Sequence, residues 1–477
     1  MKKEDISKAL GELDDELLLQ ADNRRRKRKP RWLGWVAMAA CLCLVVGLAV
    51  PLLKPAPVIA AGAICEAEYE EMPKHPLSED VSALPIDVLT QAWEDWTASY
   101  KGREESGIAS AQAVNTFSAT TIPHFLSNAG TENKVYSPAN LYMALAMVAE
   151  LSDGDTRSQI LELLAVEDIE ALRQQVQHMW KANYCDDGLN TCVLANSLWL
   201  NDKIQFRQST MERLAETYRA SSFRGTMGDE SYDALLQGWL KEQTGGMLDG
   251  EAENLRMDRR TILAIASTIY FKSSWEDVFD AERTAPDTFY APDGEKTVDF
   301  MNSYEKDVVY WGENFTAIKL ELAQGCAMWT ILPDEGYTVD EVLANDETFA
   351  MIASENWEKQ KEVMVRLKMP KFDVSSETDL VDGLQALGVA DAFDPKKSDY
   401  SPMATDSDGI MLSQVTHAAR VMVNEEGCEA SAFVLGTFFF GADICDDEID
   451  FILDRPFVFV LTGVTDQPLF AGVVNQP

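Results

Sequence analysis

The sequence predicts an α+β fold preceded by a single transmembrane helix. From about Ile108 onward, long stretches with helical periodicity alternate with strand-like runs, and no internal repeat is present. Before that region, the stretch from Trp32 to Leu53 contains no charged residue. The chain has 477 residues, of which 46% are hydrophobic and 25% charged, so it can bury a large core. We therefore expect one transmembrane segment followed by one folded domain.

The N-terminal part has the pattern of a membrane anchor. As a helix with ~1.5 Å rise per residue, the uncharged stretch is long enough for a bilayer core of about 30 Å. The basic run RRRKRKPR, at 24–31, directly precedes it, and an excess of lysine and arginine stays on the cytoplasmic side. We expect residues 1–30 in the cytoplasm, a transmembrane helix at 31–54, and the remainder outside, at the cell membrane.

Two alternatives to a permanent anchor stay open. A cleaved signal peptide is the main competitor, although its apolar region is usually shorter and lacks such a long polar leader. Small residues at 60–63 allow a later cleavage that would shed or secrete the body. A lipidated Cys41 is the weakest alternative, because the apolar run continues past it through Leu53.

An acidic juxtamembrane linker is expected at 55–107, followed by the main domain at 108–477. Apolar residues recur at helical spacing inside the linker, at Ile86, Leu89, Trp93, Trp96 and Tyr100. This spacing predicts a short helix that packs against the main domain.

Composition and motifs exclude several functions. The chain carries 79 acidic and 41 basic residues, a formal charge of -38, which repels phosphates and argues against a nucleic acid partner. It contains no GxGxxG, GxSxG, phosphate-loop, HExxH or CxxC motif, so we expect no cofactor and no metal. None of its four histidines lies in a recognised nucleophile context, so we expect no enzyme activity. Cys185 and Cys192 are close enough in sequence to pair.

The most informative segment is VMVNEEGCEASAFVL, at 421–435. A strand pattern there continues into Glu425, Glu426 and Gly427, and then into small residues. Side chains two apart on an extended chain share a face, so one face carries Cys428, Ala430, Ala432 and Val434 and the other Glu429, Ser431 and Phe433. An ordinary half-buried strand is the plain interpretation. A loop that can insert as a central strand is the alternative.

The downstream sequence favours the alternative through a family resemblance. The glycine at 427, the DRPF turn formed by Asp454, Arg455, Pro456 and Phe457, and the ending PLFAGVVNQP together resemble the serpins. Further segments follow in family order, and these are KVYSPANLYMALAMVAELSDGDTRSQIL, LANSLWLND, WLKEQTGGML, TILAIASTIYFKSSWEDVFD, MWTILPDEG and VRLKMPKFDVSSETDLVDGLQALGVADAF. In the first, Thr156 and Gln159 predict a capping box.

The resemblance implies a serpin of the bacterial, membrane-anchored type. The expected fold has a large central mixed β-sheet, smaller sheets, about nine helices and an exposed reactive loop. The implied activity is suicide inhibition of a serine or cysteine protease, in which the cleaved loop inserts into the sheet. The implied hinge consists of Glu425, Gly427, Cys428, Glu429, Ala430, Ser431 and Ala432. We expect a target protease as partner and a monomeric inhibitor.

The resemblance also places a polar cluster where the sheet opens, at Ser137, Asn140, Ser267 and His417. Asn140 stands where the family commonly has serine and Ser267 where it commonly has asparagine, an exchange that could preserve one hydrogen-bond network. Trp275 matches the tryptophan at the point where the loop enters the sheet.

The family's usual spacing of fourteen residues from Gly427 places Gly441 before the cleaved bond and Ala442 after it. A shift of one residue makes Phe440 the specificity residue, and the two alternatives rank equally. Phe440 suits a chymotrypsin-like pocket and Gly441 an elastase-like pocket. Two other functions remain, a non-inhibitory surface binding protein and a transmembrane sensor of proteolysis.

Overall fold

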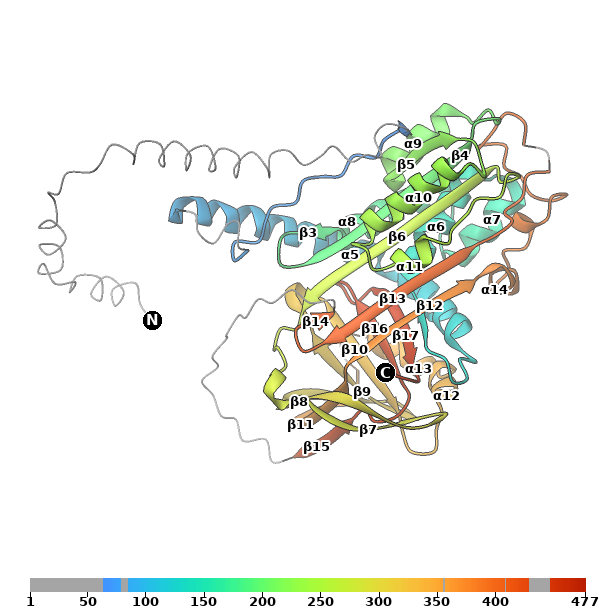
Figure 1. The fold of residues 1–477 in the computed structure, drawn as a ribbon. Helices are drawn as coiled ribbons and strands as arrows, with labels where there is room; N and C mark the ends of the chain where they lie inside the picture. Colours follow the sequence, from blue (N-terminus) through green and yellow to red (C-terminus); the bar gives the residue numbers. More distant parts are fainter. Residues whose placement is uncertain (1–62, 79–84, 355–356, 408, 429–446) are drawn as a thin grey trace, which may run out of the picture. The chain divides into compact units, whose positions relative to one another are not determined.

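The computed structural model describes residues 63–78, 85–354, 357–407, 409–428 and 447–477 (Figure 1). All of these residues belong to one compact unit, Gly62–Pro477. Residues 1–62 lie outside the described part, and so does the predicted membrane segment at 31–54. Among the described helices, none combines the length and the apolar character that a membrane crossing requires.

The described residues form ten α-helices, against about nine expected. Their bounds are α5 Ile86–Leu126, α6 Pro138–Leu151, α7 Gly154–Leu163, α8 Ile169–Asn183, α9 Gln208–Tyr218, α10 Glu230–Gln243, α11 Asp249–Ala252, α12 Val339–Leu343, α13 Asp346–Ile352 and α14 Val381–Ala386. The predicted linker helix is the first part of α5, so the expected boundary at 107/108 falls inside one continuous helix.

The β-strands of the described residues form two mixed sheets. The eight-stranded sheet has the order β1-β5-β4-β6-β14-β13-β12, with β3 paired to β4. Its strands are β1 Ala63–Cys65, β3 Cys185–Asp186, β4 Thr191–Asn201, β5 Ala220–Gly225, β6 Leu263–Ser274, β12 Phe372–Asp379, β13 Thr416–Asn424 and β14 Gly427–Cys428. Figure 1 shows β4, β6, β13 and β12 as long strands of this sheet, and α10 contacts β4 and β6.

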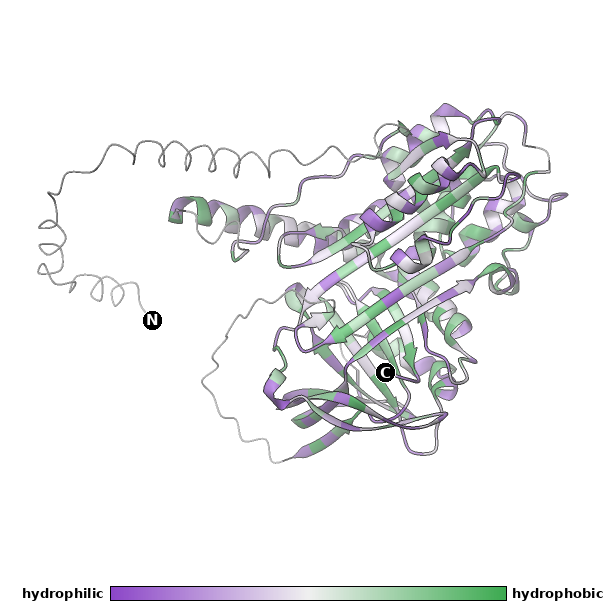
Figure 2. Cartoon of the chain, in the orientation of Figure 1, coloured by the Kyte–Doolittle hydropathy of each residue, from purple (hydrophilic) through white to green (hydrophobic). Residues whose placement is uncertain are grey.

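The nine-stranded sheet has the order β15-β11-β8-β9-β10-β16-β17-β2, with β7 paired to β8. Its strands are β2 Lys134–Tyr136, β7 Ala285–Ala291, β8 Gly294–Trp311, β9 Phe315–Glu321, β10 Ala327–Pro333, β11 Gln360–Pro370, β15 Glu448–Ile452, β16 Phe457–Thr462 and β17 Pro468–Val474. Every residue of β10, β16 and β17 is buried, as expected for strands covered on both faces. Figure 2 shows the corresponding hydrophobic colouring of β16 and β17.

Helix α6 packs against both sheets. Thirteen of its residues are buried, all except Ala144, and the helix contacts β6 and β17. A proline at its first position fits the start of a helix, and the Ser137 side chain accepts a hydrogen bond from Asn140 N as the N-cap. The sequence KVYSPANLY therefore positions a strand, a cap and a buried helix in immediate succession.

The predicted capping box at Thr156 is wrong. Helix α7 begins at Gly154, and its N-cap is Asp153, whose carboxylate accepts from Gly154 N. The Thr156 hydroxyl instead accepts a hydrogen bond from Asp399 N, and the Gln159 side chain accepts from two backbone groups near 390. These tertiary hydrogen bonds occupy the polar groups that a capping box would use.

The linker does not lie apart from the main domain. Strand β1 pairs antiparallel with β5 at the edge of the eight-stranded sheet. His75 N donates to the Asp187 carbonyl at 2.8 Å, and the His75 ring packs edge-on against Trp96 of α5. The Trp96 indole nitrogen donates to the Asp187 carboxylate at 2.9 Å, so this part of α5 contacts the hairpin of β3 and β4.

Candidate functional site

The predicted hinge begins with a tight turn between two strands. Strand β13 ends at Asn424, two residues turn, and β14 returns antiparallel to it. The Asn424 side-chain oxygen accepts hydrogen bonds from Glu426 N at 2.9 Å and Gly427 N at 3.3 Å, which stabilises the turn. The other edge of β14 pairs with β6, so that the first hinge residues lie between β6 and β13.

Glycine is the only residue type that fits at position 427, the first position of β14. Its φ is +153°, and a Cβ atom there would lie 2.2 Å from the carbonyl oxygen of Ser273 and 2.7 Å from Ser274 Cα. Both neighbours are backbone atoms of β6, which cannot rotate away as a side chain could. A glycine permits this close approach of two strands.

Cys428 points inward, as the alternation predicts. Its side chain is 2% exposed, and burial raises the pKa of its thiol, with a further rise from nearby Cys326. A small cavity continues beyond it between β6 and β13, with room for about one water molecule. The cavity is lined by Met247, Ile269, Phe271, Arg420, Val421, Met422, Cys428, Leu461 and Phe470.

Beyond Cys428 the two long strands do not pair with each other. Within the described residues, β6 pairs with β4 along its length and meets β14 only at Ser273 and Ser274. Strand β13 pairs with β12 and meets β14 only at its last two residues. In the strand order β6-β14-β13, β6 and β13 therefore flank the position that a longer β14 would occupy. We call this position between β6 and β13 the lane.

Trp275 fixes the point where β14 begins. Its indole nitrogen donates to the Asn424 carbonyl at 2.8 Å, and its backbone nitrogen donates to the Glu426 carbonyl at 3.0 Å. Its side chain is 3% exposed and packs against Phe279. The residue predicted at the loop's point of insertion thus holds the hinge turn directly.

Glu425 anchors the other side of this turn. Its carboxylate accepts a hydrogen bond from Thr284 Oγ1 at 2.9 Å and forms an ion pair with Lys371 Nζ at 2.9 Å. Burial opposes ionisation of Glu425, but the hydrogen bonds from Lys371 and Thr284 outweigh it and lower the pKa of the carboxyl group. The sequence analysis missed Thr284 and Lys371, which lie far from Glu425 in the chain.

His417 and Ser137 form the centre of the predicted polar cluster. The Ser137 backbone nitrogen donates to His417 Nε2 at 3.0 Å, and the Ser137 hydroxyl donates to the Leu469 carbonyl at 2.6 Å. Because Nε2 accepts a hydrogen bond, the imidazole is neutral with its proton on Nδ1. Burial lowers the pKa of His417 to about 4, since the ring is enclosed and a charge there would be desolvated.

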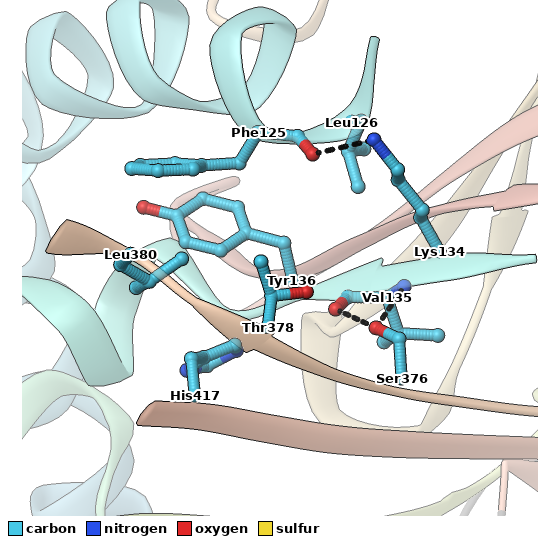
Figure 3. A pocket seen from close by; sticks show the side chains of 9 residues that line it. All are labelled: Phe125, Leu126, Lys134, Val135, Tyr136, Ser376, Thr378, Leu380 and His417. Atoms are coloured by element: carbon cyan, nitrogen blue, oxygen red, sulfur yellow. Dashed lines mark hydrogen bonds between the residues drawn. The ribbon is translucent and has the colours of Figure 1, made fainter. Parts of the chain in front are cut away.

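A second small cavity lies beside this histidine (Figure 3). The Tyr136 ring meets the His417 ring at 62°, with centroids 5.4 Å apart. The backbone of Val135 exchanges two hydrogen bonds with the Ser376 hydroxyl, and these join β2 to β12. The cavity is lined by Phe125, Leu126, Lys134, Val135, Tyr136, Ser376, Thr378, Leu380 and His417.

The other two predicted members of the cluster take no part in this hydrogen bond. Asn140 is buried in α6 and contributes its backbone nitrogen to the Ser137 cap. Ser267 is half-buried in β6 and pairs in register with Asn196 of β4. Within the described residues, neither side chain makes a hydrogen bond, so the structure brings together Ser137 and His417 but not all four.

The DRPF turn fastens the chain between β15 and β16. Arg455 donates to the Pro333 carbonyl at 2.9 Å and pairs with Asp454, whose carbonyl accepts from Tyr290 N at 2.7 Å. Phe457 then opens β16 as a fully buried side chain that packs against Phe372. Pro456 lies between them, where a fixed φ suits the turn.

The remaining predicted site residues lie outside the described part of the chain. These are Glu429, Ala430, Ser431 and Ala432 of the hinge and Phe440, Gly441 and Ala442 at the reactive bond. Among the residues that the structure does describe, no group of three or more His, Cys, Asp or Glu side chains could hold a metal ion.

Known proteins share both this sequence pattern and this fold. A family model described as serpin (serine protease inhibitor) matches residues 112–477. Serpin-ZX of Arabidopsis thaliana is 28% identical over 361 residues, which cover 72% of this chain and 92% of the relative. This relative is a plant protein and gives no support to the bacterial type expected above.

Two solved structures are similar in three dimensions. The thermophilic serpin tengpin in its native state has a TM-score of 0.68 and 26% identity, covering 76% of this chain and 93% of its own. Arabidopsis AtSerpin1 in its native stressed conformation has a TM-score of 0.66 and 26% identity, covering 79% and 98%. The matched region includes the hinge turn, the His417–Ser137 contact and the DRPF turn, and on this evidence the chain belongs to the serpin family, a family of protease inhibitors.

Proposed function

We propose that this serpin inhibits a serine or cysteine protease as a suicide substrate, and that its cleaved loop inserts between β6 and β13. The observation that carries the proposal is the position of β14. Gly427 and Cys428 already pair with both flanking strands, so an added strand has two residues in place and a lane ahead of it. Strand addition of this kind gains main-chain hydrogen bonds on both edges.

The register of β14 specifies how the rest of the hinge would insert. Continuing the ladder by two residues sets Ala430 opposite Phe271 of β6 and Val421 of β13. The next inward residue, Ala432, would face Ile269 and Ala419. Inward residues share the face of Cys428, above Leu461 and Phe470, where only small side chains fit.

The same register brings the inserting strand to the polar cluster. Six residues beyond Cys428, Val434 would lie between Ser267 of β6 and His417 of β13. Insertion would then bury the half-exposed Ser267 and form main-chain hydrogen bonds with β6 on one side and β13 on the other. Net gains of about 0.5–1.5 kcal/mol per hydrogen bond are offset by the entropy of ordering the loop, so burial and released strain must supply the surplus.

We infer a chymotrypsin-like or elastase-like target. No lysine or arginine occurs between Val421 and Asp454, which argues against proteases that cut after a basic residue. Phe440 would fill an apolar specificity pocket, whereas Gly441, followed by Ala442, would suit a narrow one. The sequence pattern at 24–53 supports an exported inhibitor that is tethered to the outer side of the cell membrane.

The test uses the full chain in detergent, incubated with chymotrypsin and with elastase. We expect a covalent complex that survives denaturing electrophoresis, a cut at 440–442 located by mass spectrometry, and a higher melting temperature once the loop is cleaved. Cleavage without a complex and without a gain in melting temperature would overturn the proposal. A non-inhibitory surface binding protein or a proteolysis sensor would then remain.

A matched pair of variants tests the insertion step itself. Cys428→Arg places a long charged side chain over Leu461 and Phe470, so the cleaved loop should fail to insert and the protein should become a substrate. Cys428→Ser keeps the size of the residue and should still form the complex. Equal complex formation by the two variants would exclude insertion along this lane.

A further inference from the structure

Two buried cysteines lie directly opposite each other in the hairpin of β3 and β4. These strands are antiparallel, and the register pairs Cys185 with Cys192. Opposite residues of an antiparallel pair share a face and have Cα atoms about 4.5–5.5 Å apart. This separation lies inside the range of about 4.4–6.8 Å over which a disulfide can form without backbone movement.

The surroundings enclose both sulfur atoms in the protein core. Cys185 is 1% and Cys192 4% exposed, and the buried guanidinium of Arg103 lies near both. The five described cysteines are free thiols in this structure, and Cys326 is the third near this position. Cys326 precedes β10 in the other sheet, so the strand register singles out Cys192 as the partner of Cys185.

The tip of the same hairpin contacts three other parts of the molecule, namely α5, residues 323–324 and β6. The buried Asp187 carboxylate accepts hydrogen bonds from Trp96 Nε1 of α5 at 2.9 Å and from Gln324 Nε2 at 2.6 Å. Asn190 donates to the Ala323 carbonyl and accepts from the hydroxyl of Ser273, at 2.8 Å each. Ser273 is the strand partner of Cys428, so the hairpin tip supports the point where β14 joins β6.

We propose that Cys185 and Cys192 form a cross-strand disulfide that closes the base of the β3–β4 hairpin and fixes its tip against Ser273. Each thiol loses its hydrogen, the two sulfur atoms join, and a disulfide of a thiol–disulfide exchange partner is reduced to two thiols. The bond would constrain the unfolded chain and stabilise the folded one.

The burial of the pair sets when this reaction occurs. Burial raises the pKa of both thiols, so little thiolate is present in the folded protein to start the exchange. The bond therefore forms while the hairpin is still accessible, during folding in an oxidising compartment or in a glutathione redox buffer. Once formed, it resists reduction until the protein opens.

Mass spectrometry of the unmodified sequence tests the pairing directly. The full chain is refolded in detergent with oxidised and reduced glutathione, denatured without reductant, alkylated and digested with trypsin. The tryptic peptide 182–203 contains both cysteines and no other. We expect it without label and about 2 Da lighter than the reduced peptide. Two labels on this peptide, or a link from either cysteine to Cys326, would overturn the proposal.

Thermal unfolding with and without reductant provides the second readout. Reductant present during refolding should lower the melting temperature of the wild type and of the Cys326→Ser control by a few degrees, about the shift that one small disulfide loop contributes. The Cys185→Ser/Cys192→Ser variant should melt at one temperature in both buffers. Equal sensitivity of this variant to reductant would contradict the pairing. Complex formation with a protease is measured separately, so failure here leaves the inhibitory function untouched.

Discussion

The buried His417 imidazole accepts a hydrogen bond from the backbone nitrogen of Ser137 at 3.0 Å, and this contact joins β13 to the start of α6. It predicts a loss of stability in mild acid. With a pKa of about 4 in the folded protein and about 6.5 unfolded, His417 binds its proton more readily when the chain is unfolded. Its contribution is complete above pH 6.5 and is lost as the pH falls to 4, by about 3 kcal/mol in total.

Urea unfolding between pH 7 and pH 4 measures this effect. The variant His417→Asn cannot titrate, so its free energy of unfolding should fall less steeply over this range, even if it starts lower at pH 7. His178→Gln is the matched control, because His178 is exposed on α8 and should keep the wild-type slope. A wild-type slope in His417→Asn would show that other groups cause the acid sensitivity.

The close approach of Gly427 to β6 predicts that alanine is not tolerated there. Gly427→Ala places a methyl group 2.2 Å from the Ser273 carbonyl oxygen at a φ of +153°, so either β14 leaves the sheet or the backbone shifts. We expect a destabilisation of about 1–3 kcal/mol, measured by urea unfolding.

Gly238 is the control for that substitution. It is exposed in α10, and a Cβ atom added there would meet no atom within 4 Å. Gly238→Ala should stabilise the protein by about 0.5–1 kcal/mol, since alanine has the higher helix propensity. If Gly427→Ala behaves like Gly238→Ala, the pairing of β14 with β6 does not persist in solution.

The ion pair between Glu425 and Lys371 predicts a coupling energy across the hinge turn. Glu425 is mostly buried but Lys371 is more than a third exposed, so we expect a coupling of only about 1 kcal/mol at pH 7. A double-mutant cycle with Glu425→Gln and Lys371→Met, read by urea unfolding, isolates this value. The lowered pKa of Glu425 means that the coupling should disappear in acid, as the pH falls below 4.5 and the carboxylate takes up a proton.

The buried carboxylate of Glu150 predicts a larger effect. It accepts hydrogen bonds from Arg173, Arg213 and Tyr218 and thereby joins α6, α8 and α9. Glu150→Gln removes the buried negative charge that Arg173 and Arg213 share and should cost about 2–4 kcal/mol in urea unfolding. Glu170→Gln removes the exposed partner of the same Arg173 and should cost less than about 1 kcal/mol. Similar costs would contradict the burial argument.

The sequence predicted those features that depend on local order along the chain. The inward face of Cys428 follows from alternation, and the role of Gly427 follows from the absence of a side chain where two strands meet. The contact of His417 with Ser137 spans 280 residues, and only the family resemblance could place the two together. Residue types and spacings therefore sufficed to predict the strand pattern of the hinge but not the long-range contacts that hold it in place.

The contacts that hold the hinge turn were missed because they join residues that are distant in sequence and have no shared motif. Lys371 and Thr284 meet Glu425 from two different strand ends, and nothing in the local sequence of either residue indicates a carboxylate partner. The Thr156 capping box failed for the opposite reason. A correct local motif was present, but the folded chain used its hydroxyl to bind Asp399.

The two ends of the segment at 429–446 are attached to different sheets, β14 to the eight-stranded sheet and β15 to the nine-stranded sheet. Beyond β15, the chain supplies β16 and β17, whose buried side chains belong to the interior of the molecule. A protease that cleaves the segment therefore produces two polypeptides that stay associated through non-covalent contacts. The short C-terminal piece should co-elute with the large one on gel filtration and separate only in denaturant.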